Sequence, residues 1–368
     1  MKKLLTFAVI AAFAFSSAAW AELELSANVT TMAGFQMDDS NAGPIGGGLT
    51  QGELPWATSA DSYHFGFVVD QAELDVENEF GENIMARFDV DFWDAMNAAG
   101  VTGLQLEQGY ITANLPIGNG MEFLLGVHNA PAGLESIDRH ENLFSTYTPG
   151  FLFLNVKRVL GAKLYYEFND VWSFDLAVLN SLNGFPVDFD SDYPSGLFRL
   201  GAKWGDEGNQ SNINLALGYG FEHSDILGDN NTDADMYGNL WGVFALNDAW
   251  DLGLEAVYRS SATQIGGDNA TAYQAQLFAV YEVNDVWTIQ GRGFYYADAN
   301  TGGFTSTNAT QWWNGSFEGT TMSGTLGATY TITDGAKMKM EYRLDIADDT
   351  LVASTMYHTV VTEFGYTF

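Results

Sequence analysis

Hydrophobic and polar residues alternate along most of this chain, which is the period-two pattern of a β-strand with two different faces. Residues 336–346, "AKMKMEYRLDI", place apolar or aromatic side chains on one face of the strand. The five alternating positions on the other face are all charged. Residues 84–92, "IMARFDVDF", repeat the arrangement. An unpaired buried charge costs several kcal/mol, so the charged face is incompatible with a dry core. Each strand therefore needs water on one side and an apolar medium on the other.

The pattern predicts sixteen strands and almost no helix. We place them at about 22–35, 62–80, 83–94, 104–115, 121–128, 159–169, 171–181, 196–205, 210–221, 236–247, 249–261, 271–284, 286–297, 319–333, 336–347 and 356–368. The connections after the even-numbered strands are short, for example Asn169-Asp170 and Asp334-Gly335, whereas most of those after the odd-numbered strands are longer. Short turns at one rim and longer loops at the other are typical of an even-stranded outer-membrane barrel.

One short phrase recurs beside three of the short turns: "YEFNDVWSF", "FALNDAWDL" and "YEVNDVWTI". It places Trp172, Trp250 and Trp287 just after a turn and on the apolar face. Tryptophan favours the membrane–water interface, because its ring can be buried while its N–H stays hydrated. We expect these residues to mark one rim of the barrel.

Composition agrees with an exported membrane barrel. Residues 1–21 have two lysines, an apolar run and a small-residue cleavage site, so we predict a cleaved signal peptide and a single barrel domain over 22–368. An N-terminal anchoring helix is the alternative. The chain has no cysteine, and a net charge of −33 argues against nucleic-acid binding. A hydrophobic content of 46% argues against disorder.

The last residues, "EFGYTF", form an alternating strand that ends in Phe368. A terminal strand of this kind resembles the signal read by the machinery that inserts outer-membrane barrels. Together with the leader and the turn pattern it favours a transmembrane antiparallel β-barrel in the outer membrane of a Gram-negative bacterium. A soluble β-sandwich with tryptophans beside its turns is the alternative.

A family resemblance supports the same fold. Residues 105–135, "QLEQGYITANLPIGNGMEFLLGVHNAPAGLE", and the preceding charged hairpin resemble a segment of porins, most closely the OmpL-like β-barrel porin family. Phosphate-selective porins are a more distant likeness, and the lumen predicted here lacks their many arginines. The resemblance implies passive diffusion of small hydrophilic solutes, and porins with this strand number are often homotrimers. Outer-membrane lipid and lipopolysaccharide would surround the barrel.

The alternation also assigns charged residues to the lumen. The bases and acids predicted to line the pore include Arg87, Lys163, Arg199, Lys203, Arg259, Arg292, Lys337, Lys339, Arg343, Glu73, Asp75, Glu77, Asp89, Asp91, Glu107, Glu122, Glu255 and Glu341. Nine bases face sixteen acids on this assignment, and further acids, among them Asp233 and Asp235, fall in outer loops. Rings of carboxylates favour cations, so we expect a water-filled, acidic, cation-leaning channel. For the loop acids, a solvated surface or cation bridges to lipopolysaccharide explain the charge equally well.

The third long loop, residues 129–158, is the candidate constriction. It is more apolar than an exposed loop should be, and it carries Glu135, Asp138, Arg139, Glu141, Lys157 and Arg158. We expect it to fold into the lumen and to set its charges against each other or against bases of the wall. A loop packed over the mouth, or an extra hairpin, is the alternative.

Other chemistry is weak in this sequence. We find no arrangement of nucleophile and base, and the five histidines lack metal-ligand spacing. The acidic runs at 188–192 and 229–235 lack the pattern of an EF-hand loop. We therefore predict no catalytic residues, no metal and no cofactor. A surface-exposed structural or adhesive barrel with a closed lumen remains the alternative to a channel.

Overall fold

The computed structural model describes residues 23–38, 63–94, 105–182, 193–206, 208–223, 232–262, 269–298, 319–349 and 352–368. The predicted leader and the acidic run at 188–192 lie outside these residues.

The strands are β1 (Leu23–Asp38), β2 (Tyr63–Phe80), β3 (Ile84–Asp94), β4 (Gln105–Leu115), β5 (Met121–Asn129), β6 (Arg158–Glu167), β7 (Trp172–Leu179), β8 (Ser195–Trp204), β9 (Ser211–His223), β10 (Thr232–Asn247), β11 (Trp250–Ala262), β12 (Asn269–Asn284), β13 (Trp287–Asp298), β14 (Gly319–Thr333), β15 (Ala336–Asp349) and β16 (Val352–Thr367).

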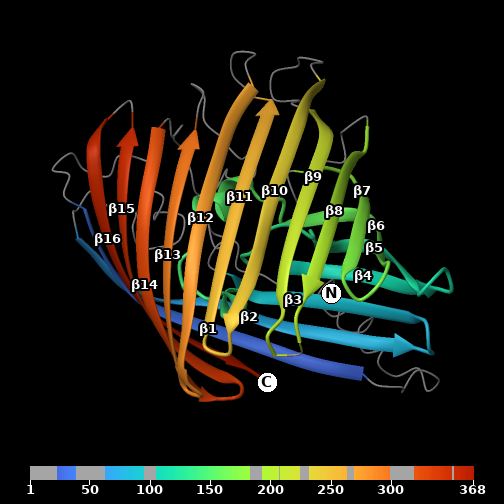
Figure 1. Ribbon diagram of the computed structural model, residues 1–368, viewed down its shortest axis with the longest axis horizontal. Helices are drawn as coiled ribbons and strands as arrows, with labels where there is room; N and C mark the ends of the chain where they lie inside the picture. Colours follow the sequence, from blue (N-terminus) through green and yellow to red (C-terminus); the bar gives the residue numbers. More distant parts are fainter. Residues whose placement is uncertain are drawn as a thin grey trace, which may run out of the picture.

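The strands form one closed antiparallel barrel, so the predicted fold is confirmed (Figure 1). Each strand pairs with its neighbours in sequence, and β1 closes the barrel against β16 with Asn28 opposite Thr367. The amide and carbonyl of Ala27 exchange 3.0 Å hydrogen bonds with those of Phe368 across this seam. A closed barrel satisfies all backbone groups between strands and leaves no open edge.

The two faces of the wall have opposite chemistry, as β15 illustrates. Lys339, Glu341 and Arg343 are at most 5% exposed, whereas Met340 and Tyr342, between them in sequence, are 37% and 42% exposed. Apolar side chains therefore face outward and charged side chains face inward. This inversion of a soluble protein's surface is what a lipid-embedded barrel requires.

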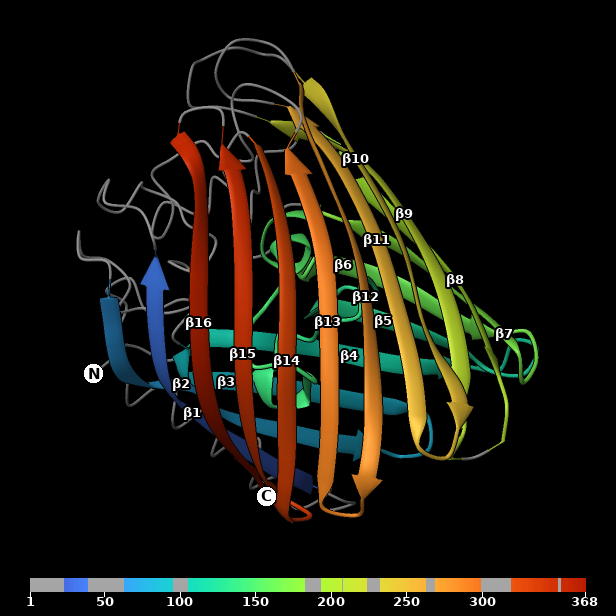
Figure 2. The same ribbon diagram turned by 60° about the vertical axis from the view of Figure 1, so that its left-hand side comes forward.

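The short turns lie together at one rim, as Figure 2 shows for the connections β10–β11 and β12–β13. In the repeated phrase, the side-chain oxygen of the turn asparagine accepts hydrogen bonds from the backbone. Asn169 Oδ1 receives the amides of Val171 at 2.9 Å and Trp172 at 3.0 Å, and Asn284 does the same for Val286 and Trp287. Asparagine favours such turns, which explains its recurrence at this position.

The barrel encloses the connection between β5 and β6, which we call L3 (residues 130–157). L3 contains two short helical turns, η2 (Arg139–Glu141) and η3 (Gly150–Leu154). Both views place it inside the barrel outline, in green (Figures 1 and 2). No helix in the described part of the chain has the length and apolar character needed to cross a bilayer.

Candidate functional site

L3 is bonded to the barrel wall on several sides. One wall contact is with β2, where the Arg139 guanidinium lies 2.6 Å from the Asp70 carboxylate. The neighbouring side chain of Gln71 donates a 2.9 Å hydrogen bond to Asp138. On the other side of the seam, Lys339 Nζ donates to the backbone oxygen of Arg139 at 2.9 Å. These bonds hold η2 against the wall formed by β2 and β15.

The middle of L3 is bonded to β13 and β15. The Glu341 carboxylate accepts hydrogen bonds from the backbone amides of Ser145, at 2.7 Å, and Thr146, at 3.3 Å, and also from the Thr146 hydroxyl. Arg343 donates to the carbonyl of Tyr147 at 2.8 Å. Wall charges thus bind this part of the loop mainly through its backbone, with one further hydrogen bond from the Thr146 hydroxyl.

Arg292 on β13 makes the contact that involves a predicted loop acid. Its guanidinium lies 2.9 Å from Glu135 and donates to the carbonyl of Thr146 at 2.8 Å. Burial raises the pKa of the Glu135 carboxyl, and the charge of Arg292 acts in the opposite direction. Glu135 is thus a loop acid that lies opposite a base of the wall.

The end of L3 is held by β10 and β11. Asn155 donates to Glu255 at 3.2 Å, and its own oxygen accepts hydrogen bonds from Tyr237 and Asn239. All four side chains are buried. A buried network whose members are bonded to one another favours a single loop conformation.

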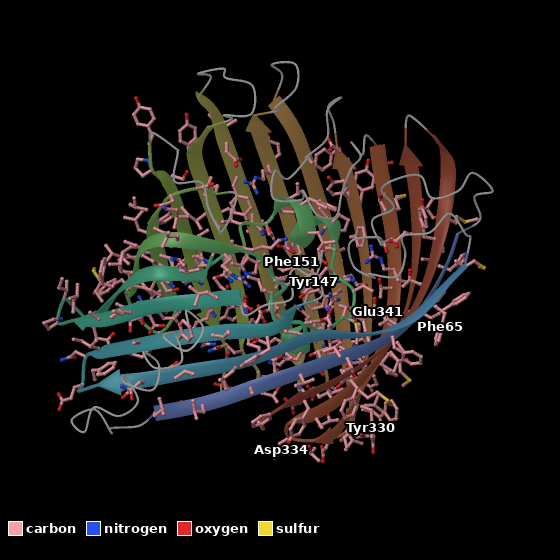
Figure 3. All side chains as sticks on the ribbon, turned by 180° about the vertical axis from the view of Figure 1, so that it is seen from behind. Phe65, Tyr147, Phe151, Tyr330, Asp334 and Glu341 are labelled. Carbon is pink, nitrogen blue, oxygen red and sulfur yellow. The ribbon has the colours of Figure 1, made fainter. Side chains whose placement is uncertain are left out.

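L3 also packs apolar side chains inside the barrel. Tyr147 and Phe151 stack with ring centroids 4.4 Å apart, and both lie within the barrel in Figure 3, beside Glu341. By contrast, Phe65 lies on the outside of the barrel and Tyr330 near the turn rim in the same view. Leu154, at 0% exposed, belongs to a buried cluster that includes Trp241 of β10. The apolar side chains of the loop therefore pack against one another and against the wall inside the lumen.

The remaining predicted loop residues lie apart from this contact set. Glu141 is exposed. Lys157 donates to the carbonyl of Leu152 at 2.9 Å, within the loop itself. Arg158 is the first residue of β6 rather than a loop residue, and it pairs with Glu107 of β4 at 2.9 Å.

The predicted wall bases are almost all neutralised by acids. Eight of the nine lie within 4.0 Å of a carboxylate: Arg87, Lys163, Arg199, Lys203, Arg259, Arg292, Lys339 and Arg343. Lys337 is exposed beside the β14–β15 turn. Among the predicted wall acids, Glu73, Asp89, Asp91, Glu107, Glu255 and Glu341 are buried, and Asp75, Glu77 and Glu122 are half-buried.

Three buried acids escaped the sequence analysis: Asp70, Asp235 and Asp298, which is the last residue of β13. Asp235, which it assigned to an outer loop, lies on β10, is 0% exposed and pairs with Arg259 at 2.6 Å. The assignment was wrong because β10 begins at Thr232 rather than at residue 236. Asp70 was omitted because the β1–β2 register shifts between Thr30 and Thr31, which turns both Asp70 and Gln71 inward. A bulge of this kind breaks strict alternation.

A cavity of about 270 Å³ lies beside L3. Its lining includes Glu135, Lys157, Arg199 and Trp241, together with the first residues of the loop. The space combines both signs of charge with an aromatic surface. The cavity is therefore lined by polar as well as apolar side chains of L3 and the wall.

The predicted interface aromatics lie at the turn rim on the outer surface. Trp172 and Trp250 are 47% and 43% exposed, and Phe368 is 68% exposed. Trp250 stacks on Tyr281 with ring centroids 4.6 Å apart, and Trp287 lies 4.8 Å from Tyr330 with the two rings tilted by 41°. Trp250 and Trp287 are thus each in contact with an aromatic ring of the adjacent strand.

Comparison with known families identifies the barrel. Residues 22–368 match the family described as "Putative beta-barrel porin-2, OmpL-like". The chain belongs to this family. This membership confirms the resemblance seen in the sequence, and the protein is a multi-pass β-barrel of the Gram-negative outer membrane with the fold of a porin channel. No curated protein matches the sequence.

Solved porin structures share the fold at low identity. The outer membrane channel DcaP of Acinetobacter baumannii aligns with a TM-score of 0.68 and 14% identity, over 94% of this chain and 97% of that chain. The anion-selective porin from Comamonas acidovorans gives 0.64 and 11%, over 94% and 99%. OmpT of Vibrio cholerae in its trimer form gives 0.59 and 12%, over 94% and 99%.

Proposed function

We propose that the protein is a passive channel for small hydrophilic solutes and ions, with an acidic lumen that favours cations. The proposed cation preference is supported by the way the charged side chains of the wall are paired. Nearly every wall base is bound to an acid, and surplus acids such as Glu77 and Asp251 form no ion pair within the described residues. A surplus of carboxylates on a narrow wall attracts cations and repels anions.

In this proposal L3 forms the constriction. It is bonded to walls on several sides of the lumen, and Glu135, Arg292, Lys157 and Arg199 bring both signs of charge to the same level. Opposed charges produce a transverse field that orders water and selects among polar solutes. The family and the fold support passive diffusion, since no energised plug is needed for such a channel.

A barrel with a closed lumen, serving a structural or adhesive role at the cell surface, is the second candidate. The observation that favours it is the apolar packing of L3, in which Tyr147, Phe151 and Leu154 are each at most 2% exposed. Residues packed to this degree resist displacement by a solute.

Single-channel recording in a planar bilayer separates the two candidates. A diffusion channel gives discrete ohmic steps, and in a potassium chloride gradient a cation preference displaces the reversal potential toward the potassium equilibrium potential. Silence over many insertions verified by immunolabelling would support the closed barrel. A reversal potential displaced toward chloride would refute the cation preference while leaving the channel intact.

The proposal includes the partners expected of such a barrel. Outer-membrane lipid and lipopolysaccharide contact the apolar outer face, the barrel-insertion machinery reads the strand ending in Phe368, and the assembly is a homotrimer. Cross-linking in native outer membranes tests the trimer, with a ladder that stops at three copies as the expected result. Slower assembly of a Phe368→Ala chain tests the insertion signal.

A further inference from the structure

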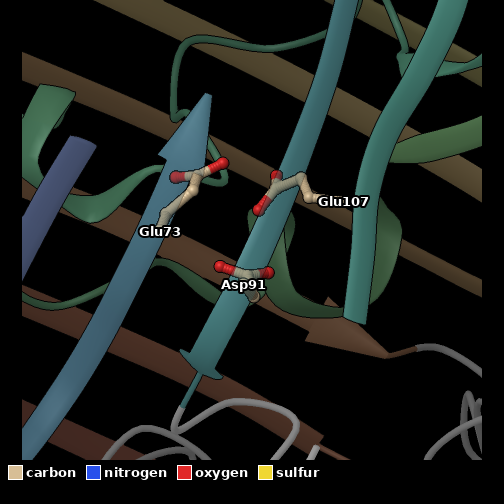
Figure 4. Close-up of side chains that lie close together, drawn as sticks. All are labelled: Glu73, Asp91 and Glu107. Atoms are coloured by element: carbon tan, nitrogen blue, oxygen red, sulfur yellow. The ribbon is translucent and has the colours of Figure 1, made fainter. Parts of the chain in front are cut away.

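Three acidic side chains converge inside the wall at adjacent strands. Glu73 of β2, Asp91 of β3 and Glu107 of β4 point toward one another in Figure 4. Each offers a carboxylate oxygen, these oxygens lie within 4.8 Å of one another, and each side chain is at most 4% exposed. The cluster therefore lies in a closed part of the lumen.

Irregular strand pairing brings these residues together. The register shifts between Ala72 and Glu73 on the β2–β3 side, and between Asp89 and Val90 on the β3–β4 side. The second shift turns both Glu107 and Gln108 inward. Bulges re-aim side chains next to functional sites, and here they direct carboxylates of three strands to one point.

The pairing also sets like charges directly opposite each other. Glu73 faces Asp91, and Asp75 faces Asp89 on the next inward pair. Opposed like charges destabilise a sheet unless something compensates them. Asp89 is compensated by Arg87 at 2.9 Å and by the Gln108 amide at 2.7 Å. Within the described residues no base is paired with Glu73, and Arg158, whose charge acts on Asp91, is already paired with Glu107.

The polar atoms around Glu73 and Asp91 are short of hydrogen-bond donors, a shortage that a bound cation would meet. Asp91 is 1% exposed, and neither of its carboxylate oxygens accepts a hydrogen bond of ordinary geometry within the described residues. Asn28 and Gln71 donate their amide groups to Glu73 at 2.6 and 3.2 Å. Their own amide oxygens, likewise buried, are then left without a donor in the described part of the chain. Buried acceptors without donors are costly unless water or a cation binds them.

The charge balance of the cluster leads to the same conclusion. Asp138 of L3 joins it through Gln71, whose amide donates to both Glu73 and Asp138. Four carboxylates therefore meet, and the ion pair that compensates them is that of Arg158 with Glu107 at 2.9 Å. A bound divalent cation would remove most of the remaining negative charge.

We propose that Glu73, Asp91 and Glu107 form a buried calcium site in the wall of the barrel, with the amide oxygens of Asn28 and Gln71 available to complete the shell. All candidate ligands are oxygens, which hard divalent cations prefer. Calcium–oxygen distances of about 2.3–2.6 Å place opposite ligands about 5 Å apart, which accommodates the observed spacing. Magnesium needs shorter, nearly octahedral coordination and fits this spacing less well.

Such a site would brace the constriction. It would join β2, β3 and β4 to the start of β6 through Arg158, and to η2 of L3 through Gln71 and Asp138. Calcium would stabilise the arrangement of L3 and would lower the negative charge of the lumen at that level. The site does not depend on which solute the channel carries.

Calcium titration of the refolded full chain, in detergent free of lipopolysaccharide and after treatment with EDTA, tests the site. The matched variants are Asp91→Asn and, as a control for other lumen acids, Asp251→Asn. We expect isothermal titration to show one tight site in the unaltered protein and in D251N, weakened by more than about tenfold in D91N. Equal calcium binding by all three proteins would assign the ion to surface acids and overturn the proposal.

Thermal unfolding separates bound calcium from protons shared among the carboxyls. Calcium should raise the melting temperature of the unaltered protein above its value in EDTA, and should have little effect on D91N. If D91N does not fold, Glu107→Gln takes its place. A melting temperature at neutral pH that does not respond to calcium would indicate shared protons and refute the site. Silence in a bilayer would refute the channel without changing either calcium result, so the two proposals fail separately.

Discussion

The guanidinium of Arg139, in L3, lies 2.6 Å from the carboxylate of Asp70 on β2, and both side chains are at most 5% exposed. Removing one member of a buried ion pair leaves the other charge without compensation, at a cost of about 3–5 kcal/mol. We therefore expect Arg139→Ala to lower the free energy of unfolding by about this amount in urea titrations of the refolded protein.

The control for this prediction is the double variant Arg139→Ala/Asp70→Asn, which removes both charges. It should recover much of the loss. A single variant that unfolds at the same urea concentration as the unaltered protein would show that the pair does not hold the loop.

The bonds from Glu341 to the backbone of L3 predict a second effect. Glu341→Gln cannot accept all three hydrogen bonds from Ser145 and Thr146, and bonds to a charged group contribute about 1.5–3 kcal/mol each. We expect larger current fluctuations in single-channel records, because the middle of the loop is less restrained. Glu122→Gln, a half-buried wall acid near the turn rim, is the matched control and should leave the open-channel noise unchanged.

Asp89 provides a test of the lumen charge. Asp89→Asn removes a carboxylate and leaves the Arg87 guanidinium without its ion-pair partner, so the local charge becomes more positive. The reversal potential in a potassium chloride gradient should move away from the potassium equilibrium potential. Arg87→Gln should move it in the opposite direction. Identical reversal potentials in all three proteins would place these residues outside the ion path.

The stacking of Trp250 on Tyr281 predicts a stability effect at the turn rim. Trp250→Ala removes an aromatic pair worth about 1 kcal/mol together with an interfacial anchor. We expect a lower unfolding free energy in lipid vesicles, and a partial recovery with Trp250→Phe, which restores a ring without the N–H. Equal stability of the alanine and phenylalanine variants would show that the ring contact contributes little.

The pKa of Glu135 leads to a pH prediction. Because burial raises this pKa, Glu135 loses its charge on acidification at a higher pH than an exposed glutamate does. Because the proton is bound more tightly in the docked loop than it would be in a released, solvated loop, acidification through the raised pKa stabilises the docked position of L3, and the penalty for burying the charge appears as the pH rises. Open-channel noise should therefore fall as the pH is lowered through that range, and Glu135→Gln, which cannot ionise, should remove this pH dependence.

Much of the barrel could be predicted from local patterns. The alternation of charge and apolar residues in β15, and the asparagine–tryptophan turns, are local consequences of one strand face meeting water and the other lipid. These patterns located all sixteen strands and the rim that carries the short turns. Errors occurred where the alternation is interrupted, as at the bulge that buries Asp70, or where a strand extends into a loop, as at Asp235.

The path of L3 could not be read from the sequence, although its apolar composition suggested an inward fold. Its partners, such as Glu341 and Arg292, are far from it in the chain and meet it only because the barrel closes. The same is true of the cluster of Glu73, Asp91 and Glu107, which depends on register shifts between neighbouring strands.

The sequence by itself determined which side of each strand faces lipid, because side-chain direction alternates with every residue and the two solvents differ in polarity. The tertiary structure alone decided which charges meet across the lumen. That outcome depends on barrel closure, strand register and bulges, and a shift of one residue in any pair would bring different side chains together.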